Sequence, residues 1–98
     1  MKGLYYRGED IGLRLRGNER ISLDAMDWDI ALVQGQDAVI LSKAVAERVE
    51  DNVYTLWIPS ATTEQMRCGK WDVQIRLKND KTYIATAINV ITLTDSAF

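Results

Sequence analysis

Histidine is absent from the 98 residues, and cysteine occurs once, as Cys68. Without histidine, the chain lacks the side chain that most often acts as a general base near neutral pH, every His-dependent triad and the common zinc sites. A single cysteine cannot close an internal disulfide, and with no histidine to deprotonate it Cys68 is interpreted as a small apolar residue. We therefore expect no enzymatic activity, no catalytic residue, no metal site and no cofactor.

Long apolar runs and blocks of like charge are missing too. Apolar runs such as residues 31–33 and 38–41 are far shorter than the roughly 20 residues that cross a bilayer. Residues 1–7 contain no apolar signal-peptide core, so Sec-type export is not expected. Twelve Lys and Arg are interleaved with fourteen Asp and Glu, which argues against nucleic-acid binding. The sequence thus predicts a cytoplasmic or virion protein without membrane insertion.

Other features that could carry chemistry are weak. Asp24, Asp27 and Asp29 lie close together, but the segment lacks the glycine and distal glutamate of an EF-hand, so these residues are interpreted as solvated loop acids. No glycine-rich segment precedes a helix as in a phosphate-binding loop. No linker or repeat divides the chain, and we expect residues 1–98 to form one domain.

The organising signal is alternation of apolar and polar residues with period two. It is clearest in residues 11–16 and 71–78, where apolar side chains alternate with glycine or with charged and polar residues. Residues 43–50 fit either a short helix or an irregular strand, and the irregular strand is favoured. Strands are expected at residues 11–16, 28–33, 38–42, 43–50, 53–58, 71–78 and 82–93.

The segments between these strands carry turn and helix signals. Pro59 ends a strand, residues 60–66 offer hydroxyl caps for one helical turn, and residues 68–69 stop it. Residues 79–81 are typical of a hairpin turn, and Ala85 and Ala87 suggest a bulge in the last strand. We therefore predict an all-β fold, an immunoglobulin-like antiparallel β-sandwich of about seven strands with one short helical crossover.

Three residues mark a candidate interaction surface. Trp57 is out of phase with Tyr54, Leu56 and Ile58, so its ring is predicted to point away from the core, as an interface anchor or a carbohydrate platform. Partial burial under a neighbouring loop is the alternative. Ala31 and Val33 are also predicted to face outward and to form an apolar patch where a partner docks.

Four segments together match the pattern of a known family: residues 6–15 (YRGEDIGLRL), 21–28 (ISLDAMDW), 53–59 (VYTLWIP) with the crossover 60–66, and 69–77 (GKWDVQIRL). Through these segments the chain resembles the immunoglobulin-like domains of phage and prophage tail or baseplate proteins, such as the N-terminal domain of the baseplate upper protein family. Trp71 stands where those domains carry tyrosine.

The resemblance implies a virion or prophage structural part that acts through contacts with other tail or baseplate proteins, or with copies of itself. The alternative hypothesis is a carbohydrate- or cell-surface-binding module, in which Trp57 and Tyr5, Tyr6 or Tyr83 would form an exposed aromatic platform. A small hydrolase is a third hypothesis, which the length of the chain argues against because little material is left to wall a substrate cleft.

Overall fold

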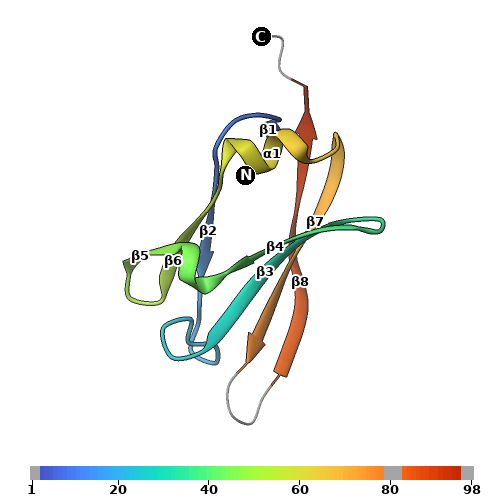
Figure 1. Ribbon diagram of the computed structural model, residues 1–98. Coiled ribbons are helices and arrows are strands. Elements are labelled where there is room, and N and C mark those ends of the chain that lie inside the picture. Colours follow the sequence, from blue (N-terminus) through green and yellow to red (C-terminus); the bar gives the residue numbers. More distant parts are fainter. Residues whose placement is uncertain (1–2, 79–82, 96–98) are drawn as a thin grey trace.

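Two β-sheets packed face to face form the body of the molecule in a computed structural model that describes residues 3–78 and 83–95 (Figure 1). The first sheet has five strands, in the spatial order β1 (Leu4–Tyr6), β8 (Tyr83–Thr94), β7 (Gly69–Lys78), β3 (Asp27–Gln34) and β4 (Asp37–Ser42). The second has three, in the order β2 (Ile11–Arg16), β6 (Val53–Ile58) and β5 (Ala46–Glu50). The described part of the chain contains no helix long and apolar enough to cross a membrane.

The strand order is that of an immunoglobulin-like sandwich. The sheet β2-β6-β5 matches the B-E-D strands of that fold, and β8-β7-β3 matches G-F-C with β4 added at the edge. The predicted fold class is therefore confirmed, with two differences. The described chain has an eighth strand, β1, and β1 pairs with β8 in parallel, whereas the other pairings are antiparallel.

Alternation of side chains along the strands builds the core. β2 buries every second residue, as does β7 from Trp71 to Leu77, with the apolar residues turned inward as predicted. Trp28 and Trp71 are fully buried, and their indole N–H groups donate to the carbonyls of Leu23 and Arg67. The Trp28 ring also meets Tyr54 edge to face at 5.3 Å between centroids, so large aromatic side chains occupy the space between the sheets.

The connections differ from the prediction in detail. Residues 43–50 contain a 3₁₀ turn, η1 (Lys43–Val45), followed by β5, so the favoured strand is correct only for its second half. The helix α1 (Ser60–Gln65) crosses between the sheets within the predicted residues 60–66 and, as predicted, ends before Cys68. Its first amide, on Ser60, is bound by the carboxylate of Asp10 at 2.7 Å rather than by a hydroxyl of its own segment. The predicted turn at 79–81 lies outside the described residues.

The bulge predicted in the last strand is present, one position away. The β7–β8 register runs from Val73 opposite Asn89 to Gln74 opposite Ala87, which leaves Ile88 as the extra residue. Every residue from Ala85 to Val90 is exposed, so this stretch of β8 is not covered on either face. One flank of the sandwich is consequently less covered than the rest.

Candidate functional site

The outer face of the five-stranded sheet, meaning the side chains turned away from β2-β6-β5, carries an unusual number of exposed apolar groups. Pairing places Ala31 opposite Ile40, and Val33 opposite Ala38, on this face. Four large side chains on the same face are strongly exposed: Ile40 by 63%, Leu4 by 45%, Val90 by 44% and Tyr6 by 43%.

Two cross-strand rows form the middle of the outer face. One row runs from Ile40 through Ala31 to Gln74, and the next runs from Ala38 through Val33 to Asp72. The rows continue onto β8 with Ala87 beside Gln74 and Val90 beside Asp72. Apolar groups therefore lie at both ends of each row, with one polar residue of β7 between them.

Sequence reasoning found Ala31 and Val33 but missed the larger side chains around them. The signal for Ile40 was in the sequence, because residues 38–41 are apolar at every position and a strand of that kind has an apolar residue on both faces. Leu4 and Tyr6 carried no such signal, since β1 has only three residues and is held by its pairing with Thr92–Thr94 of β8.

Trp57 lies on the other side of the molecule. It belongs to β6 in the second sheet and is 48% exposed, so its predicted outward orientation is confirmed. Its ring lies over Gly12 of the adjacent strand, where a β-carbon would come within 3.0 Å of it. The three predicted residues therefore do not form one surface, because Ala31 and Val33 lie on the opposite sheet. Alternation of apolar and polar residues predicts which side chains of a strand point outward, but not to which sheet the strand belongs.

The aromatic residues proposed for a carbohydrate platform are also separated. Tyr6 faces outward on the five-stranded sheet, Trp57 faces outward on the three-stranded sheet, and Tyr5 packs against the core. The side chain of Tyr83 lies outside the described part of the structure. Trp57 and Tyr6 thus do not share a face on which a sugar ring could stack.

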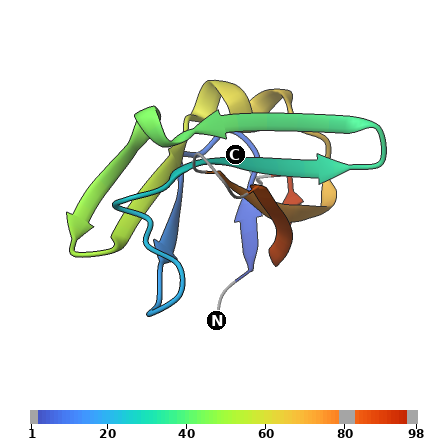
Figure 2. The same ribbon diagram turned by 90° about the horizontal axis from the view of Figure 1, so that it is seen from below.

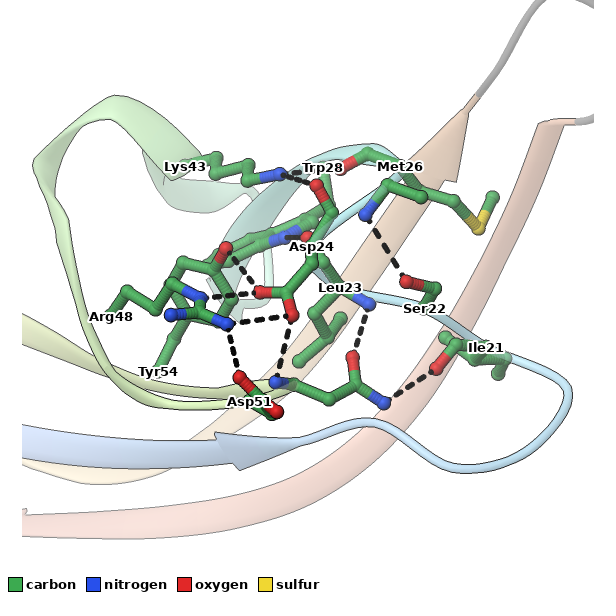
Figure 3. Close-up of polar contacts among 12 residues, drawn as sticks. Ile21, Ser22, Leu23, Asp24, Met26, Trp28, Lys43, Arg48, Asp51 and Tyr54 are labelled. Carbon is green, nitrogen blue, oxygen red and sulfur yellow. Dashed lines mark hydrogen bonds and ion pairs between the residues drawn. The ribbon is translucent and has the colours of Figure 1, made fainter.

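A cluster of polar contacts around Asp24 joins the loop before β3 to the β5–β6 turn (Figure 3). The Asp24 carboxylate accepts hydrogen bonds from Arg48 Nε at 2.9 Å and Nη2 at 3.2 Å, from Tyr54 Oη at 2.8 Å and from the Asn52 amide at 3.0 Å. Arg48 and then the Tyr54 hydroxyl hold the pKa of Asp24 well below its usual range. A carboxylate so saturated with donors is a poor proton acceptor, and the cluster is structural.

The neighbouring acids are paired rather than simply solvated, which corrects the prediction. Asp29 contacts Arg76 across the β3–β7 pair, and Asp27 lies 3.7 Å from Lys78 on the same two strands. Within residues 3–78 and 83–95, no group of three or more His, Cys, Asp or Glu side chains is arranged to hold a metal ion. Cys68, interpreted from the sequence as a small apolar residue, is exposed.

A hollow lies on the flank where β2 and β8 face one another. It has a volume of about 540 Å³, and its lining includes residues 12–16 of β2, Thr86, Ile88 and Asn89 of β8, and Tyr5 of β1. Its floor consists of core side chains, including Leu13, Leu15 and Ile75. Figure 2 shows β1 between β2 and β8 on this side of the sandwich.

Comparison with known proteins gives the fold and little else. No protein-family model matches the chain, and no curated protein matches it. Among solved structures, the chain is similar to part of a protein from Bacteroides vulgatus named as a "putative glycoside hydrolase", with a TM-score of 0.60 and 8% identity. The likeness covers 99% of this chain and 17% of that protein, so the chain spans less than a fifth of its neighbour's length.

Proposed function

We propose that the chain is a non-enzymatic structural or adaptor domain of a phage or prophage tail-like assembly, which binds a partner protein through the outer face of the five-stranded sheet. The observation that carries the proposal is the exposure of Ile40, Val90, Leu4 and Tyr6 on that face. Monomeric proteins seldom leave several large apolar side chains on one face, and such faces mark contacts with other proteins.

The charges at the rim of the outer face fit the same role. The ion pairs between Asp29 and Arg76 and between Asp27 and Lys78 lie at one end of the β3–β7 pair, beyond the apolar rows. Interfaces commonly place apolar groups at the centre and polar groups at the rim. The resemblance of the sequence to baseplate immunoglobulin-like domains supports tail or baseplate proteins, or further copies of this chain, as the partners.

The test is the mass of the protein in solution, measured by light scattering over a concentration series, alone and co-expressed with the proteins encoded beside it. A defined oligomer or complex is expected. Ile40→Lys should abolish it, because a buried unpaired charge costs several kcal/mol at an interface. Val45→Lys is the matched control, since Val45 is 56% exposed but lies in η1 off the outer face.

Two outcomes would contradict the proposal. A wild-type protein that stays monomeric with every neighbour has no partner of the proposed kind. Equal loss of assembly in Ile40→Lys and Val45→Lys would place the contact away from the outer face. Circular dichroism of both variants shows whether either loss comes from unfolding.

The second candidate function is a carbohydrate-binding module. The observation that favours it is the name of the Bacteroides vulgatus neighbour, of which this chain resembles a domain-sized part. In that case oligosaccharides should quench or shift the fluorescence of the half-exposed Trp57. The separation of Trp57 from Tyr6 makes this the weaker candidate, and the absence of saturable quenching over a panel of oligosaccharides would remove it.

A further inference from the structure

The flank between β2 and β8 has the features of a site for an added β-strand. The immunoglobulin fold normally has a strand beside B, on the side away from E. In the described residues, β2 corresponds to strand B of that fold, and it pairs only with β6. β1 covers β8 only from Thr92 to Thr94, so the edge of β8 before Thr92 is also unpaired in the described part.

The backbone of β2 offers free hydrogen-bonding groups to this flank. The Gly17 amide donates to the Asn52 carbonyl at 2.9 Å, and the β2–β6 register continues from that pair. In an antiparallel ladder, hydrogen-bonded pairs occur at every second residue, so Leu15, Leu13 and Ile11 bond to β6. The N–H and C=O groups of Gly12, Arg14 and Arg16 consequently point away from β6, toward the open flank.

The hollow beside this edge is apolar at its floor and incompletely closed. Leu13 and Leu15 each keep 7% of their surface exposed and Ile75 keeps 6%, whereas Ile30 and Leu56 in the middle of the same two sheets keep none. A strand added to β2 would place alternate side chains over this floor. An edge of unpaired backbone beside an apolar hollow is the geometry of β-strand addition.

The charge of the residues around the hollow indicates what kind of strand could bind there. Among the residues that the structure describes, Arg14 and Arg16 are the only charged ones that line the hollow, and both are exposed. Within the described residues Arg14 makes no ion pair, and Arg16 lies 3.8 Å from Glu50. Pairing of β2 with β2 of a second copy would bring these arginines together, which is unfavourable. An acidic strand from another protein matches both the charge and the apolar floor.

We infer that the flank between β2 and β8 binds an extended segment of a partner protein, in which apolar residues that enter the hollow alternate with acidic residues that face Arg14 and Arg16. The inference rests on the proposed function only in taking the chain to act by protein contact. It uses a different surface, because neither Ile40 nor Val90 lines the hollow. The two surfaces would allow one domain to join two partners.

The test uses a capped seven-residue peptide that alternates glutamate and valine, titrated into the full chain and followed by backbone amide NMR. Saturable shifts are expected at Gly12, Arg14, Arg16 and Ile88. Two control peptides should not bind. In one, lysine replaces glutamate; the other keeps the glutamate–valine sequence but carries methyl groups on alternate backbone nitrogens, so that it cannot form the hydrogen-bond ladder with β2.

Variants of Arg14 separate the backbone contribution from the charge. Arg14→Pro removes a donor that points to the flank without breaking a β2–β6 hydrogen bond, and should weaken peptide binding by about tenfold or more. Arg14→Thr keeps the donor, so the peptide should still bind with a reduced preference for glutamate over lysine. Ile40→Lys should leave peptide binding unchanged even where it abolishes the assembly of the proposed function.

The inference is overturned if the glutamate peptide causes no shifts at millimolar concentration, if the methylated peptide binds equally well, or if the shifts fall on the outer face. Should Arg14→Pro fail to fold, the methylated peptide still tests the ladder on the wild-type chain. A wild-type chain that binds the peptide but assembles with no partner would contradict the proposed function alone, and a wild-type chain that assembles but does not bind the peptide would contradict this inference alone.

Discussion

Asn52 ties together the loop between β2 and β3 and the turn between β5 and β6. Its backbone has a positive φ of 61°, which asparagine tolerates better than most residues. Its side-chain Oδ1 accepts the Leu23 amide at 2.6 Å, and its Nδ2 donates to the Ile21 carbonyl at 3.2 Å. These bonds fix the position of the chain just before it enters β3, and Gly17 packs directly against the same carboxamide.

Gly17→Ala should therefore be strongly destabilising although residue 17 lies in a connection. A β-carbon there would overlap the Asn52 carboxamide and break its two side-chain hydrogen bonds. Urea denaturation should show a loss of about 2 kcal/mol in the free energy of unfolding. In an Asn52→Gly background, which removes the overlap and keeps the positive φ, the same substitution should cost much less. Equal costs in both backgrounds would mean that the strain lies elsewhere.

Asp24 gives the protein a predictable response to acid. Because its folded pKa is lowered by Arg48 and Tyr54, the stabilisation it provides is complete above the ordinary carboxyl pKa of about 4 and is lost as the pH falls toward the folded value. Asp24→Asn should be less stable than wild type at pH 7, and its stability should fall less between about pH 5 and pH 2.

Urea denaturation over that pH range measures the difference in slope. Asp51→Asn is the control, because Asp51 contacts the same Arg48 but its side chain is 99% exposed, where solvent screens an ion pair and leaves it little effect on stability. It should therefore change stability at pH 7 much less than Asp24→Asn does. Parallel acid curves for wild type and Asp24→Asn would show that the Asp24 cluster does not contribute to folding.

At the scale of elements, the sequence was informative where burial alternates and silent where an element depends on a distant partner. Residues 11–16 and 71–78 were predictable because one face of each strand is buried. β1 was missed because three residues carry no periodic signal, and its place is set by pairing with Thr92–Thr94. The prediction that a hydroxyl of residues 60–66 caps α1 was wrong for the same reason. The carboxylate that binds the Ser60 amide belongs to Asp10, fifty residues earlier in the chain.

The candidate surfaces also divide into what local sequence pattern predicts and what depends on distant parts of the chain. The outward direction of Trp57, Ala31 and Val33 followed from the phase of their strands. Their distribution over two opposite faces depends on strand order, which periodicity does not encode. The hollow at the flank is defined by an unpaired edge, so no local pattern could reveal it.

The whole molecule is a sandwich with one well-covered side and one open side. β3 and β7 lie in the interior of the five-stranded sheet, flanked by β4 and β8, whereas β2 ends the three-stranded sheet with a bare edge in the described residues. Stability should therefore be distributed unevenly, with the interior strands opening last. The backbone of β2 is the place where this asymmetry can be measured residue by residue.

Native-state hydrogen exchange of the free protein should show alternating protection along β2. The amides of Leu13 and Leu15 bond to β6 and should exchange about a hundredfold more slowly than those of Gly12, Arg14 and Arg16, which face the flank. The control is β6, which pairs with β2 on one side and β5 on the other, so Tyr54 to Trp57 should be protected without alternation.

Uniform protection along β2 would mean that its edge is already covered in the free protein, and the flank could not then accept a strand. Alternation that disappears when the glutamate–valine peptide is added would show that the peptide completes the sheet, because only a new ladder protects the outward amides and leaves those bonded to β6 unchanged.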